Sequence, residues 1–202
     1  MSGSYLSILL ELILSLTCLL FSIRLFKEQH KLISISYIFI AFTTFLGALH
    51  YAGVEESIKY HVFFGKMCLI LASPAIGYGI FLAFKNPISE QKKITLTLYT
   101  LGFMFASSLV FSFSEDISKS IGLVLNLIFS IALIKLLLFY FKKSNKNLIL
   151  ALLTMLIFIY IGFLANFINV KPFESGDIVH IASIFGYSFI FLLVIDLKKY
   201  KI

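Results

Sequence analysis

The sequence predicts an all-α polytopic membrane protein: a bundle of seven transmembrane helices, with the N-terminus outside and the C-terminus in the cytoplasm. Hydrophobic residues make up 60% of the 202 residues and charged residues 13%, whereas soluble domains carry about 25% charged residues. The hydrophobic residues come in blocks close to the roughly 20 residues that cross a bilayer. Lysine and arginine concentrate in alternate connections between these blocks, and such connections lie in the cytoplasm.

Seven blocks are long enough to be spans, so we expect one transmembrane domain over residues 1–202. The expected spans are about 4–26, 31–53, 60–84, 94–113, 117–141, 147–169 and 177–197. The connections are short, carry turn and charge signals, and leave no room for a second domain. The first block has no basic residues before it and no small-residue cleavage site, so we expect it to stay in the membrane as a helix.

Basic residues divide the connections into two sets. Twelve lie on the expected cytoplasmic side: Arg24, Lys27, Lys31, Lys85, Lys92, Lys93, Lys142, Lys143, Lys146, Lys198, Lys199 and Lys201. The opposite side holds only Lys59, Lys119 and Lys171, with the acidic residues Glu55, Glu56, Glu115, Asp116, Glu174 and Asp177. The net charge of +7 is therefore a topology signal, and we expect no nucleic-acid partner. In a bacterium, the chain would be an integral protein of the inner membrane.

Polar residues within the expected spans fall along single helix faces when each helix is drawn at about 100° per residue. In chain order these faces hold Ser4, Ser7, Glu11, Ser15, Cys18 and Ser22; Ser36, Thr43, Gly47 and His50; Lys66, Ser73 and Gly77; Lys119, Gly122, Asn126 and Ser130; Gly162, Asn166 and Asn169; and Asp177, His180, Ile184 and Tyr187. We expect a kink at Pro74. The fourth span has no ionisable group, so we expect it to face lipid. Serine and glycine alone also favour close helix packing.

The ionisable residues are the candidate functional residues, because a charge inside the bilayer costs at least about 2–3 kcal/mol. With the N-terminus outside, several lie at similar depth near the outer surface. We therefore expect one outward-facing pocket formed by Glu11, His50, Lys66, Asn126, Asn166, Asp177, His180 and Tyr187. His61, Glu55 and Glu56 lie in the outer connection before the third span, where they could border the mouth of this pocket.

This pattern leaves several kinds of chemistry open. Lys66 could anchor a small polar or anionic ligand, with His50 and His180 as proton-sensitive partners. His50, Asp177 and His180 could bind zinc, whose ligands include imidazole nitrogen and carboxylate oxygen. His50 and His180 could ligate haem. In a purely structural alternative, Lys66 pairs with Glu11 or Asp177, and Asp177 stabilises the start of its helix.

His50 on the second span and His180 on the seventh give the chain a partial resemblance to the superfamily of alkaline ceramidases and progestin–adipoQ receptors. That resemblance implies a zinc-dependent hydrolase acting on membrane lipid. The pattern of that superfamily also has a serine before the first histidine, an aspartate on the third helix and HxxxH on the seventh. Leu46, Lys66 and Ile184 stand at those positions here.

The combination of His50, Lys66 and "DIVH" at the start of the last span is also similar to small bacterial seven-span proteins. This second resemblance implies no activity. The leading hypothesis is a membrane protein that binds, senses or moves a small polar ligand or ion. The alternative is a metal-dependent hydrolase of lipid amides or esters. The sequence leaves enzymatic activity, cofactor and oligomeric state open, with zinc as the cofactor that the alternative requires.

Overall fold

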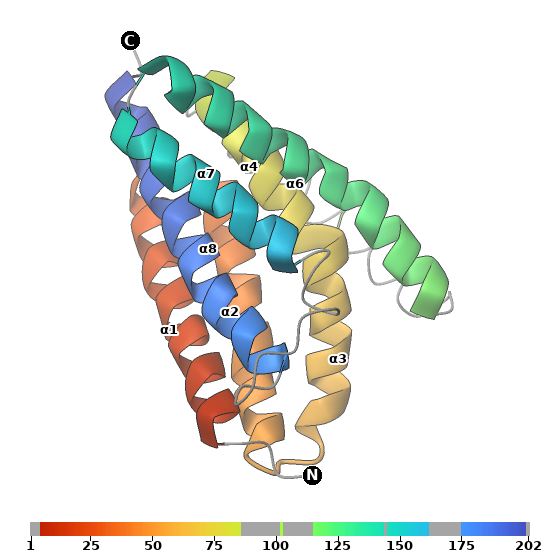
Figure 1. Cartoon of the computed structure of the whole chain (residues 1–202). Helices are drawn as coiled ribbons and strands as arrows, with labels where there is room; N and C mark the ends of the chain where they lie inside the picture. The colour runs from red at the N-terminus through yellow and green to blue at the C-terminus, as the bar shows by residue number, and fades with distance from the viewer. Residues whose placement is uncertain (1–4, 86–101, 103–114, 144, 162–174, 201–202) are drawn as a thin grey trace.

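The computed structural model describes residues 5–85, 102, 115–143, 145–161 and 175–200 (Figure 1). Within these ranges the elements are helical and no strand occurs. The elements are α1 (Tyr5–Lys27), α2 (Lys31–Tyr51), α3 (Ser57–Met67), the π-helical turn η1 (Cys68–Ala72), α4 (Ser73–Lys85), α6 (Glu115–Lys143), α7 (Asn145–Ile159), α8 (Ser175–Leu197) and the 3-10 turn η3 (Lys198–Tyr200).

Five of the described helical stretches are long and apolar enough to cross a membrane. They are Tyr5–Lys27, Lys31–Tyr51, Ser57–Phe84, Val124–Lys143 and Asp177–Tyr200. Lys146–Ile159 is a shorter apolar helix. The expectation of an all-α, multi-pass integral membrane protein is therefore confirmed. The expected span 94–113, apart from Gly102, lies outside the described residues, and the count of seven and the orientation stay predictions.

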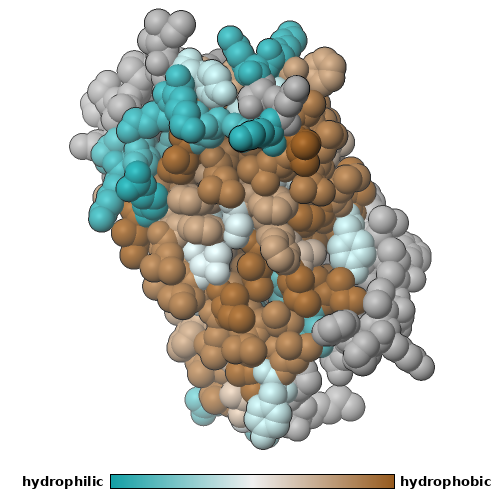
Figure 2. Space-filling view, turned by 60° about the vertical axis from the view of Figure 1, so that its left-hand side comes forward, coloured by the Kyte–Doolittle hydropathy of each residue, from teal (hydrophilic) through white to brown (hydrophobic). Residues whose placement is uncertain are grey.

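The surface of the bundle is largely hydrophobic, as contact with lipid requires. Large hydrophobic side chains are exposed along the outer faces of the helices; on α1 they include Leu9, Leu12, Leu16, Leu20 and Ile23. Figure 2 shows a broad hydrophobic face with hydrophilic side chains gathered at one end. The basic C-terminal ends of α1 and α6 and the basic turn η3 that follows α8 lie together at the end of the bundle where the chain terminates (Figure 1). This arrangement is the one that a positively charged cytoplasmic surface would have.

In the interior, helices pack both against the next helix in the chain and against helices far away in the sequence. α1 contacts both α2 and α8, α7 contacts α6 and α8, and α4 contacts α6. The core is apolar, with Tyr37, Ile76, Leu136 and Ile190 almost fully buried. Gly77 lets α4 approach α6 closely, because a Cβ atom there would come within 2.6–2.9 Å of the α6 backbone. Small residues at such contacts are typical of membrane helices.

The connection between α1 and α2 is a tight helix C-cap. The Gln29 N–H donates to the Phe26 carbonyl and the His30 N–H donates to the Leu25 carbonyl, which is the hydrogen-bond pattern of a Schellman motif. Gln29 has a φ of 68°, a left-handed conformation that favours glycine. This turn sends α2 back along α1, so that the polar faces of the two helices meet.

The expected disturbance at Pro74 takes the form of a π-helical turn just before it. The Ser73 N–H donates to the Cys68 carbonyl, one residue further back than in an α-helix. The Leu69 carbonyl therefore loses Ser73 as its usual partner, and the next donor along the chain would be Pro74, which has no N–H. The Asn126 side chain of α6 donates to this carbonyl at 2.8 Å. A side chain from a neighbouring helix thus satisfies a backbone group that proline leaves open in the bilayer.

Candidate functional site

The centre of the candidate site is a carboxylate–imidazole pair between α1 and α8. Glu11 is 1% exposed, and its Oε1 lies 3.1 Å from Nε2 of His180. One turn nearer the helix starts, Ser7 donates a 2.7 Å hydrogen bond to Oδ1 of Asp177. Ser7 and Glu11 are four residues apart and Asp177 and His180 are three apart, so each helix presents both groups on one face. The two helices run side by side with their N-terminal ends together (Figure 1), and the two pairs form successive rungs between them.

Gly47 on α2 makes room for the Glu11 carboxylate. A Cβ atom at this position would overlap that carboxylate and would come within 2.9 Å of Cε1 of His61. Glu11 therefore lies directly against the α2 backbone, and the His61 ring borders the same space. Gly47 belongs to the polar face predicted on the second span. Its role there is close packing, as is common for small residues in membrane helices.

Two imidazoles, of His180 and His61, border the buried carboxylate, and a third, of His50, stacks on His61. The His61 ring lies with its Nδ1 3.1 Å from the Thr43 carbonyl oxygen, and it stacks on the His50 ring at a centroid distance of 6.4 Å. The Tyr51 ring contacts both His50 and His180, at centroid distances of 5.4 and 6.5 Å. We refer to Ser7, Glu11, His50, His61, Asp177 and His180 as the polar cluster.

Two atoms of the central pair have no hydrogen-bond partner among the described residues. They are Oε2 of Glu11 and Nδ1 of His180, and both are buried. Nearly all buried polar atoms in folded proteins have a partner, and an open one is costly where the surroundings are apolar. The two open atoms belong to the two side chains that already face each other, so the pair has unused bonding capacity on both sides.

The structure gives Glu11 and Asp177 partners other than Lys66, which is their partner in the structural alternative. Lys66 is half-buried near the end of α3. In the described part of the chain, Glu11 pairs with His180 and Asp177 pairs with Ser7. Asp177 also lies in the first turn of α8, where a carboxylate stabilises the helix start, as the structural alternative anticipated.

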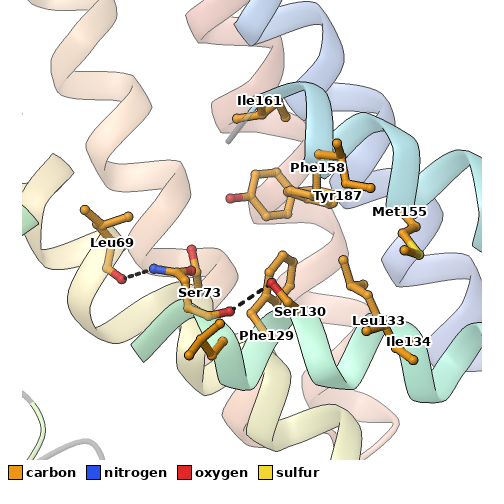
Figure 3. Close-up of a pocket in the computed structure, with 13 residues that line it drawn as sticks. Leu69, Ser73, Phe129, Ser130, Leu133, Ile134, Met155, Phe158, Ile161 and Tyr187 are labelled. Atoms are coloured by element: carbon orange, nitrogen blue, oxygen red, sulfur yellow. Dashed lines mark hydrogen bonds between the residues drawn. The ribbon is translucent and has the colours of Figure 1, made fainter. Parts of the chain in front are cut away.

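Asn126 and Tyr187 lie at a different place from the polar cluster. Both line a cavity between α6, α7, α8 and the η1–α4 junction (Figure 3). Asn126 holds the Leu69 carbonyl there, and the Tyr187 backbone carbonyl accepts a 2.7 Å hydrogen bond from the Tyr37 hydroxyl. Asn166 lies outside the described residues.

The structure adds His61 to the residues of interest. Sequence reasoning treated it as part of the outer connection, but it belongs to α3 and is half-buried beside Glu11. The available signal was its spacing from Cys68, seven residues along the same helix face. Both residues contact Thr43, since the Cys68 thiol lies 3.1 Å from the Thr43 hydroxyl.

The three expected zinc ligands, His50, Asp177 and His180, each contact a different partner. His180 faces Glu11, Asp177 faces Ser7, and His50 stacks on His61. Among the residues that the structure describes, no group of three or more His, Cys, Asp or Glu side chains is placed to hold a metal ion. Tyr51 contacts both His50 and His180, the two residues proposed for haem. Zinc and haem ligation stay predictions from the sequence.

Comparison with known proteins identifies a family and no activity. The chain matches the family described as "Family of unknown function (DUF6962)" over residues 6–199, so it belongs to that family. No curated protein and no solved structure matches it.

Proposed function

We propose that this member of the DUF6962 family binds a small polar ligand or ion at its polar cluster, between Glu11 and His180. The observation that supports the proposal is the pair of open atoms, Oε2 of Glu11 and Nδ1 of His180, which are buried in a protein of the membrane. A ligand with a hydrogen-bond donor for the carboxylate and a polar group for the imidazole would satisfy both. Ionisable groups inside membrane bundles commonly mark solute or ion pathways.

The charge of the pair depends on one proton. A carboxylate beside a neutral imidazole carries a net negative charge, whereas a carboxylate beside an imidazolium is neutral. A bound cation or hydrogen-bond donor would compensate the negative charge of the unprotonated pair. His61 borders the Glu11 carboxylate and stacks on His50, so these two imidazoles are candidates to pass protons to the pair. Binding is the step that sensing and transport share, so the proposal covers both roles.

The test is ligand-dependent thermal stability of the purified protein in detergent. The probes are sodium, potassium, ammonium, chloride, phosphate and glycine, each added at two pH values. A ligand that binds only the folded protein raises stability by about 2.7 kcal/mol at one hundred times its Kd. We expect at least one probe to raise the melting temperature of wild type and of Glu28→Gln, a carboxylate change at the other end of α1. Glu11→Gln and His180→Ala should lose the effect.

Two results would contradict the proposal. One is that no probe stabilises the wild-type protein at either pH. The other is that the same probe stabilises Glu11→Gln as much as wild type, which would place binding elsewhere.

The rival function is a zinc-dependent hydrolase of lipid amides or esters that uses His50, Asp177 and His180. It requires these three side chains to converge on one metal ion, and the described contacts give each of them a different partner. Metal analysis of the purified protein separates the two functions. Stoichiometric zinc that is lost in His180→Ala would favour the hydrolase over the ligand-binding proposal.

A further inference from the structure

A second site is the cavity between α6, α7, α8 and the η1–α4 junction (Figure 3). Its volume is about 280 Å³. Most of its wall is apolar and comes from α6 and α7: Phe129, Leu133, Ile134, Met155, Phe158 and Ile159. None of its lining residues belongs to the polar cluster, so it is independent of the proposed function.

Two of the polar side chains that line this cavity, Asn126 and Ser130, are hydrogen-bonded to the protein itself. The Asn126 amide donates to the Leu69 carbonyl, and the Ser130 hydroxyl donates to the Asn126 backbone carbonyl at 3.2 Å. The Ser73 side chain lies beside the Tyr187 hydroxyl. The cavity therefore offers apolar surface and needs no polar ligand to satisfy its walls. Cavities of this kind stay dry and take apolar molecules.

The rim of the cavity is exposed on the membrane side of the bundle. Leu127, Ile134 and Ile159 line it and are 58%, 43% and 38% exposed. Leu127 and Ile134 lie in the Val124–Lys143 span, and Ile159 ends the apolar helix Lys146–Ile159. The medium at this level of a membrane bundle is the acyl chains of lipids.

The size of the cavity suits part of one such chain. An apolar cavity of about 150 Å³ holds one benzene molecule, so 280 Å³ corresponds to roughly ten carbon atoms. From its volume, its apolar wall and its opening toward the bilayer, we infer that this cavity binds the acyl chain of a membrane lipid, inserted between α6 and α7.

The test uses tryptophan fluorescence, because the chain contains no tryptophan. Phe158→Trp places one reporter in the cavity wall, and Phe141→Trp places a matched reporter on the exposed face of α6. Each protein, in detergent, is titrated with a phospholipid that carries bromine atoms on its acyl chain, which quenches nearby tryptophan. We expect half-maximal quenching of Phe158→Trp at a several-fold lower lipid fraction than that of Phe141→Trp.

The second part of the test fills the cavity with a larger side chain. Ser130→Phe, made in the Phe158→Trp protein, should remove this preference, and Ser130→Leu should reduce it in case the larger side chain disturbs folding. Ile131→Phe, on the exposed face of the same helix, should leave it unchanged. Equal quenching of the two reporters, or a preference that survives both Ser130 substitutions, would overturn the inference. Lack of quenching at Phe158→Trp in pure brominated lipid would also overturn it, since another part of the chain would then fill the cavity.

Discussion

Replacing Asn126 by leucine tests how the bundle accommodates Pro74. The substitution keeps the approximate size of the side chain and removes the 2.8 Å hydrogen bond to the Leu69 carbonyl. A buried carbonyl left without a partner costs about 1–3 kcal/mol, while side-chain hydrogen bonds between membrane helices measure about 0.6 kcal/mol on average and reach about 1.7 kcal/mol. Because the Ser73 N–H bonds Cys68 instead and Pro74 has no N–H, we expect a loss near the upper end of the membrane range, about 1–2 kcal/mol.

The cause of this loss can be isolated with a second substitution. Pro74→Ala supplies the missing N–H, so the helix can bond the Leu69 carbonyl without Asn126. In that background we expect Asn126→Leu to cost about 1 kcal/mol less than it does in wild type. The assay is reversible unfolding in mixed micelles, followed by circular dichroism. Ser130→Ala is the control, because the Ser130 hydroxyl donates to the Asn126 carbonyl of its own helix. An equal cost of Asn126→Leu in both backgrounds would refute the reasoning.

Three further predictions concern other parts of the bundle. Gly47→Ala should destabilise the protein by about 1–3 kcal/mol through overlap with the Glu11 carboxylate, while Gly65→Ala, which has open space around it, should not; equal effects would contradict the packing described at Gly47. Gln29→Gly should stabilise the fold by up to about 1 kcal/mol in the same unfolding assay, because it relieves the left-handed conformation at the α1–α2 turn; a loss of stability would argue against that turn. Cysteine at Glu55 should react with an impermeant thiol reagent in intact cells and cysteine at Lys142 should be protected, and the reverse pattern would invert the predicted orientation.

The sequence was informative where the membrane imposes a simple rule. Apolar blocks of bilayer length predicted the helices, since each must satisfy its own backbone in lipid. The described ends of α2, for example, at Lys31 and Tyr51, lie within two residues of the predicted ones. The stripe through Glu11 correctly marked a face of α1 that is buried: Ser7, Glu11, Cys18 and Ser22 are all below 5% exposed.

The sequence was less informative about which polar groups meet. Charge alone suggested Lys66 as a partner of Glu11 or Asp177, but the partner depends on which helices are neighbours, and α1 packs against α2 and α8. The role of Asn126 was also hidden. It compensates for Pro74, which is far away in the chain, and only the packing of α6 against η1 and α4 brings the two together.

Histidine NMR of the protein labelled with ¹⁵N at its four histidines tests most directly whether Glu11 and His180 form the binding site. The probe that stabilises the protein is titrated into wild type and into Glu11→Gln. The proposal predicts that the His180 resonances shift with ligand in wild type, that those of His30, which lies in the α1–α2 turn, stay in place, and that the His180 shift is lost in Glu11→Gln. A stabilising ligand that leaves the His180 resonances unchanged in wild type would contradict it.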